Sequence, residues 1–129
     1  MAVAYVTTLR NARMDEISAA VGSAGLIRFY DGTRPATGGA ATTLLATLSW
    51  AAAMAAAAAG GVLTANAVVG ANASSSGTST WARVTTSGGT AVADMNVGTS
   101  GSDINMTTNV FVAGQPVAIS SFVLTEGNP

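Results

Sequence analysis

From residue 26 onward the chain consists of short β-prone runs that follow one another closely and are separated by glycine-rich turns. The runs are 26–30, 42–50, 61–69, two within 79–97, 104–107, 109–112 and 117–125. About seven or eight short strands with turns between them are typical of two packed antiparallel sheets or of a closed β-barrel. We therefore expect a mainly β fold, an antiparallel β-sandwich or jelly-roll-like barrel, over residues 26–126.

One helix is expected near the N-terminus. Between Thr7 and Val21 apolar residues recur at intervals of three and four, and charged residues fill much of the other face. We assign this helix to residues 9–22 and a possible extended arm to residues 1–8. Helix, arm and sandwich are expected to form a single β-rich domain over residues 1–129, because a chain of this length fits one domain.

The most apolar stretch, 44–59, is the one candidate for a membrane segment. It is shorter than the roughly 18 to 20 apolar residues that span a bilayer, it consists mostly of alanine, and Gly60 and Gly61 end it. We expect no membrane helix here. Residues 51–59 are predicted to form a loop with one helical turn at most, because nine residues are too few for a stable isolated helix.

A β-hairpin is predicted over residues 79–97, around the turn at Ser87-Gly88-Gly89. Arg83 and Asp94 are almost equally far from this turn, so we expect them to face each other across the two strands as an ion pair. Trp81 and Val84 do not share a face in strict alternation, which indicates either a bulge or burial of both faces.

The scarcity of charged and nucleophilic side chains excludes several classes of function. The basic residues are all Arg, the net charge is -1, and there is no His, Cys or Lys. Such a chain has no basic stripe for nucleic acid, no ordinary catalytic triad and no Cys/His zinc site. We expect no enzyme activity, no metal and no cofactor. The carboxylates are expected to serve turns, solvated surfaces and ion pairs: Asp15, Glu16, Asp31, Asp94, Asp103 and Glu126.

Two groups of apolar side chains remain as candidates for a binding site. The N-terminal residues are apolar enough to pair with a neighbour as an added strand, so Val3, Tyr5 and Val6 are candidate interaction residues. The alternative is that this arm completes the protein's own sheet. Trp50 and Trp81 are candidates for a sugar-stacking platform, although a place in the core is favoured because large side chains are few.

Five short motifs are the most distinctive parts of the sequence: Tyr30-Asp31-Gly32-Thr33, Gly61-Val62-Leu63-Thr64, Trp81-Ala82-Arg83-Val84, Gly98-Thr99-Ser100-Gly101-Ser102-Asp103 and Gly114-Gln115-Pro116. Through these motifs nearly the whole chain after about residue 8 resembles a family of small virion structural proteins encoded by tailed bacteriophages and prophages. The resemblance implies a β-rich fold and a place in the head of the virion. It implies no catalytic residues.

We therefore expect a bacteriophage virion protein that decorates and cements the capsid surface after assembly in the host cytoplasm. Its expected partners are the major capsid protein and copies of itself in a homo-oligomer, with no nucleic acid and no membrane. Low charge suits this role, because it limits repulsion between neighbouring copies. The alternatives are a neck, tail or fibre component of the virion, and a carbohydrate-binding module that uses Trp50 or Trp81.

Overall fold

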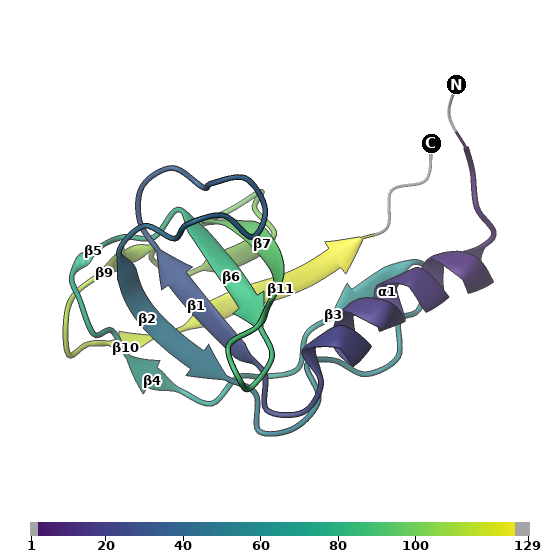
Figure 1. Cartoon of the computed structure of the whole chain (residues 1–129), viewed down its shortest axis with the longest axis horizontal. Coiled ribbons are helices and arrows are strands. Elements are labelled where there is room, and N and C mark those ends of the chain that lie inside the picture. Colours follow the sequence, from purple (N-terminus) through teal and green to yellow (C-terminus); the bar gives the residue numbers. More distant parts are fainter. Residues whose placement is uncertain (1–2, 126–129) are drawn as a thin grey trace.

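The structure, a computed structural model, describes residues 3–125 (Figure 1). Within this range one helix, α1 (Thr7–Val21), precedes the strands. The strands are β1 (Leu26–Tyr30), β2 (Leu44–Ser49), β3 (Val62–Thr64), β4 (Ala71–Asn72), β5 (Gly77–Thr78), β6 (Trp81–Thr85), β7 (Ala91–Gly98), β8 (Ile104–Met106), β9 (Val110–Phe111), β10 (Pro116–Val117) and β11 (Ile119–Thr125).

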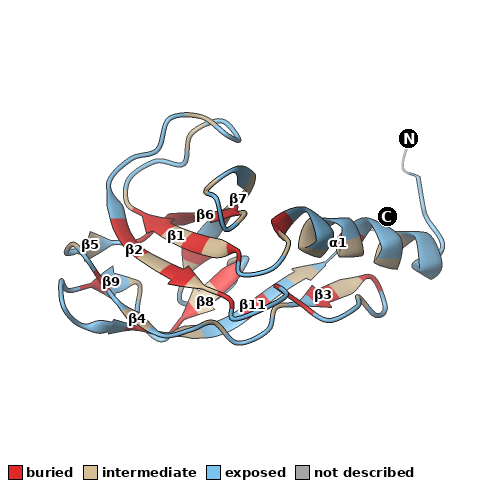
Figure 2. Cartoon of the chain, turned by 60° about the horizontal axis from the view of Figure 1, so that its bottom comes forward, coloured by how far each residue is buried: buried red, intermediate tan, exposed pale blue. Residues whose placement is uncertain are grey.

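Seven strands form one sheet in the order β2-β1-β6-β7-β8-β11-β3, and two short pairs, β10-β4 and β5-β9, lie beside it. The sheet folds over itself, so that β1, β2 and β6 lie above β8, β11 and β3 (Figure 2). This confirms the mainly β sandwich with one N-terminal helix. Among the described residues the outer strands β2 and β3 do not pair, so the sheet does not close into the barrel that was the other expectation.

The two layers are joined through β7 and β8, which run parallel with Val97 opposite Ile104. All other strand pairs are antiparallel, so the expectation of a purely antiparallel sandwich is wrong at this one pair. The connecting loop is tied to the strand that precedes it, because the Asp103 carboxylate accepts a hydrogen bond from Asn96 N at 3.1 Å. The glycine and serine residues before Asp103 predicted a turn, but not that the chain would resume its former direction.

The core lies between the two layers and is filled from both. Trp50, directly after β2, packs against Phe122 of β11 with ring centroids 6.2 Å apart, and Phe29 of β1 meets Phe111 of β9 edge-on at 5.5 Å. Burial of such large rings supplies much of the favourable free energy of folding. The other large side chains that are almost fully buried are Trp81, Ile27, Leu45, Leu48, Met54, Leu63, Ile104, Met106, Val21 and Val84.

The helix begins at Thr7, two residues earlier than assigned, and ends at Val21. Val6, with extended backbone, precedes it, so of the arm assigned to residues 1–8 the structure describes 3–6 as non-helical. Polar contacts hold α1 against the loop before β3: Asp15 accepts a hydrogen bond from Ala58 N and Asn11 accepts one from Gly61 N, both at 2.7 Å. Residue 126, where the predicted sandwich ends, lies outside the described residues.

The hairpin of β6 and β7 is confirmed, and both faces of β6 are buried, which explains why Trp81 and Val84 need not share a face. Residues 51–59 form a loop, without the helical turn that the alanine run allowed. The loop bonds with other segments instead, since Ala24 N donates to Ala52 O at 2.9 Å. Within residues 3–125 no helix has the length and apolar content needed to cross a bilayer.

Candidate functional site

The N-terminal arm, residues 3–6, belongs to no strand of the described chain and extends beyond the N-terminal end of α1 (Figure 1). Val3 is 54% exposed and Val6 is 73% exposed. The guanidinium carbon of Arg13 lies 4.9 Å from the ring centroid of Tyr5. The three interaction residues predicted in this arm are therefore accessible, and over the described residues 3–6 the arm does not complete the protein's own sheet, as the alternative required.

Trp81 lies inside the fold, with no exposed surface. Its indole stacks on Tyr30, with centroids 4.5 Å apart and planes 17° apart. The indole N–H donates to Asp31 O at 3.1 Å and to Thr42 Oγ1 at 3.0 Å, at opposite ends of the loop that joins β1 to β2. Trp81 therefore anchors that loop.

Trp50 is also internal, with 1% of its surface exposed. Its indole N–H donates to Asn66 O at 3.0 Å, in the segment that follows β3. The interpretation of both tryptophans as core residues is confirmed. Since neither presents a ring face to solvent, the sugar-stacking platform lacks the surface that it requires.

Arg83 and Asp94 form the expected ion pair, with Arg83 Nε 2.7 Å from Asp94 Oδ1 and Nη2 3.0 Å from Oδ2. The pair also binds the β1–β2 loop, because Gly38 N donates to Asp94 Oδ2 at 3.0 Å and Arg83 Nη2 donates to Gly39 O at 2.8 Å. The hydrogen bond from Arg83 holds the pKa of Asp94 below its usual value, against the effect of burial, and Asp94 raises the pKa of Arg83. Both side chains form their hydrogen bonds within the fold, which indicates a structural role for this pair.

The other carboxylates have structural roles or face solvent. The Asp31 carboxylate accepts a hydrogen bond from Thr43 N at 3.0 Å, which closes the β1–β2 loop. Asp15 is half-buried against Ala58, so its expected solvation is wrong, whereas Glu16 is exposed as expected. Among residues 3–125 no group of three His, Cys, Asp or Glu is arranged to hold a metal ion, and Glu126 lies outside this range.

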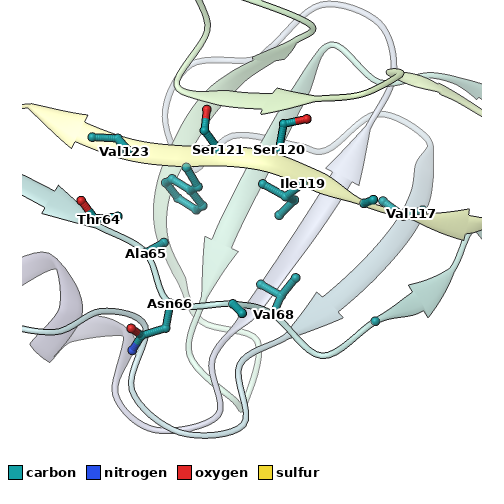
Figure 3. A pocket seen from close by; sticks show the side chains of 13 residues that line it. Thr64, Ala65, Asn66, Val68, Val117, Ile119, Ser120, Ser121 and Val123 are labelled. Carbon is teal, nitrogen blue, oxygen red and sulfur yellow. The ribbon is translucent and has the colours of Figure 1, made fainter.

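An uncharged groove of about 570 Å³ opens between β11 and the segment 66–70 (Figure 3). Half-buried Ile119 and Val68 lie on its opposite walls, and Phe122 contributes to its floor. Every lining residue is uncharged. A volume of this size falls within the range of pockets that bind small molecules or short peptide segments. The residues around the groove are Thr64, Ala65, Asn66, Ala67, Val68, Gly70 and 117–123.

The groove exists because 66–70 is bonded to the alanine-rich loop and not to β11. Asn66 N donates to Met54 O at 2.7 Å, and Asn66 Nδ2 donates to Ala53 O at 3.1 Å. Further along, Val69 N donates to Ser49 O at 2.7 Å. Together with the bond from Trp50, these contacts fix one wall of the groove. Sequence reasoning missed this site because the partners are 12 to 20 residues away and no local pattern announces them.

The molecule is thus a small β-sandwich. Its accessible features are an apolar N-terminal arm and an uncharged groove. Comparison of the chain with protein-family models, with curated proteins and with solved structures finds no match. The described residues present several exposed apolar surfaces to a partner. Besides the arm and the groove they include Val110 and Val112 around β9, which are 57% and 54% exposed.

Proposed function

We propose that this protein is a structural component of a bacteriophage virion, a decoration protein that stabilises the capsid surface through contacts with the major capsid protein and with copies of itself. The sequence motifs that resemble small phage virion proteins support this proposal, and so does a β-rich fold of low charge. The four described Asp carboxylates all accept hydrogen bonds within the fold, which supports a structural role over an enzymatic one.

The observation that carries the proposal is the apolar N-terminal end. Val3 and Val6 in the arm are 54% and 73% exposed, and Leu9 in the first turn of α1 is 44% exposed. Apolar side chains that gather at one exposed place mark contact sites in proteins that assemble, because their burial against a partner is favourable. A lattice of identical copies offers such a partner at every position.

Quantitative mass spectrometry of purified phage particles that carry this gene tests the proposal. A capsid decoration protein is expected at a copy number comparable to that of the major capsid protein, and particles that lack it are expected to lose resistance to heat or low salt. Absence from particles would overturn the proposal. A handful of copies would overturn the capsid assignment and indicate the neck, tail or fibre instead.

Two matched variants test the role of the arm. Val3→Asp places a charge on the exposed arm, and Ser87→Asp places the same charge on the exposed turn between β6 and β7. Because a charge is costly to bury at an apolar contact, Val3→Asp is expected to reduce incorporation into particles strongly. Ser87→Asp is expected to leave it unchanged. Equal incorporation of the two variants would show that the arm does not make the contact.

A further inference from the structure

Main-chain pairing between the segment β3–β4 and the segment β10–β11 is interrupted at the groove. On one side the pairing ends where Ala65 N donates to Phe122 O at 3.0 Å. On the other side it resumes where Val117 of β10 lies opposite Ala71 of β4. Between these points no main-chain pairing within the described residues joins 66–70 to 118–121. One edge of the chain is therefore open over the four residues 118–121, of which the last three belong to β11, and this edge lies inside the uncharged groove.

We propose that this groove binds the N-terminal arm of a second copy of the chain, as an added strand along residues 118–121. An extended segment that joins a sheet edge gains main-chain hydrogen bonds, while its side chains fill pockets on either side. The inference deepens the proposed function and rests on it, since it specifies the contact between copies.

The length and the chemistry of the arm match the opening. Residues 3–6 and residues 118–121 are both four residues long, and four extended residues span about 13 Å. The arm has no charged side chain, and neither has any residue that lines the groove. Neither partner therefore has to lose the hydration of a charge on binding, and Val3 can bury its apolar surface between Ile119 and Val68.

The arm of the same copy starts at the wrong end of the sheet to fill this groove. Asn11 of α1 is bonded to Gly61, directly before β3, and Val62 at that end lies opposite Thr125, the last described residue of β11. The arm continues outward from there (Figure 1), whereas the groove begins at the other end of β3, where Thr64 lines it. The described residues of the arm, 3–6, at about 3.3 Å each, are too short to run back along α1 and β3 and then along the groove. An arm from a neighbouring copy meets no such constraint.

The groove is open before the arm arrives, which lowers the cost of binding. The bonds from Trp50, Asn66 and Val69 hold the wall away from β11, so no internal pairing has to break when a strand is added. A preformed site loses less conformational entropy on binding than one that must be opened.

Cross-linking of single-cysteine variants of the purified full chain tests the contact, and the natural chain contains no Cys. Val3→Cys is mixed with Ala118→Cys in the groove and treated with a short bis-maleimide; the control mixture pairs Val3→Cys with Ser87→Cys. We expect a covalent mixed dimer at a yield several times that of the control. Equal yields would overturn the proposal, and so would an internal cross-link in a dilute Val3→Cys/Ala118→Cys double variant, since the arm would then fill its own groove.

Sedimentation of the charge variants supplies a second readout that does not depend on virions. Val3→Asp is expected to weaken self-association at least about tenfold, because the variant would bury a charge in an uncharged groove. Ser87→Asp is expected to associate like the natural chain. Unchanged association of Val3→Asp would overturn the arm-in-groove contact even if the protein is abundant in particles. Association that depends on the arm, in a protein that is absent from particles, would overturn the proposed function alone.

Discussion

Arg83 on β6 and Asp94 on β7 form a two-point ion pair in which the Asp94 side chain is 1% exposed and the Arg83 side chain is 12% exposed. The same two side chains bind Gly38 and Gly39, so the pair connects the hairpin to the long loop between β1 and β2. A contact of this kind stabilises the fold only while both partners are charged, and this requirement makes its contribution measurable.

Replacement of Asp94 by Asn is expected to lower the free energy of unfolding by about 3 kcal/mol, because it leaves the Arg83 guanidinium without a counter-ion in a largely buried place. Urea unfolding at neutral pH measures the loss. The matched control is Asp103→Asn, which changes an exposed carboxylate that accepts a single bond from Asn96 N, and it is expected to cost about 1 kcal/mol or less. Equal losses in the two variants would contradict the importance of the pair.

The stability of the natural chain is expected to fall in acid in part through Asp94. The hydrogen bond from Arg83 holds the folded pKa of Asp94 below that of an unfolded carboxyl, about 4. The contribution is therefore complete above the unfolded pKa and is lost as the pH falls through the lower folded pKa. Urea midpoints at pH 7 and pH 3 should differ less for Asp94→Asn than for the natural chain. An equal pH dependence would show that Asp94 gains nothing from its charge on folding.

The Arg83–Asp94 pair was predictable because a hairpin is a local structure. Once the turn at 87–89 is located, the positions that face each other follow by counting. The same locality explains why the helix could be anticipated from the spacing of its apolar side chains. The burial of both tryptophans was anticipated from composition instead, because large side chains are few in this chain.

The groove could not be predicted in this way, because it depends on where a segment forms its long-range bonds. The pattern of residues 61–69 predicts a single strand, yet only Val62–Thr64 pairs with β11. Asn66 and Val69 then bond to Met54 and Ser49, and the choice between these acceptors and β11 depends on the packing of the whole core. The parallel pairing of β7 with β8 is another consequence of tertiary packing that turn chemistry does not encode.

Gly25 is expected to tolerate no side chain. A Cβ at this position would meet Val21 Cγ1 and lie 2.9 Å from the main-chain oxygen of Thr85, which cannot move without disturbing β6. Gly25→Ala should lower the free energy of unfolding by about 2 kcal/mol, as overpacking does. Gly88→Ala is the control, since its nearest neighbour is Thr86 Oγ1 at 3.9 Å, and it should change stability by less than about 0.5 kcal/mol. Thermal unfolding measures the loss in both variants. Equal shifts of the unfolding temperature would show that Val21, at the end of α1, can move to make room for the new side chain.

Trp50→Phe is expected to loosen the groove while Trp81→Phe leaves it intact. Both variants keep an aromatic ring in the core and lose an indole N–H, at a cost of about 2 kcal/mol each from the lost hydrogen bond and the smaller ring. The lost bonds differ, because Trp50 donates to Asn66 O and Trp81 donates to Asp31 O and Thr42 Oγ1. Hydrogen exchange should therefore accelerate at 66–70 in the first variant and in the β1–β2 loop in the second.

If the wall at 66–70 must stay in place for the arm to enter, Trp50→Phe should also lower the yield of the cross-link between Val3→Cys and Ala118→Cys. Trp81→Phe, equally destabilised, should not. The comparison separates the shape of the groove from global stability. The two variants are expected to lose similar global stability, but only Trp50→Phe changes the wall of the groove. Equal cross-linking in both would show that the arm binds along residues 118–121 without the fixed wall at 66–70.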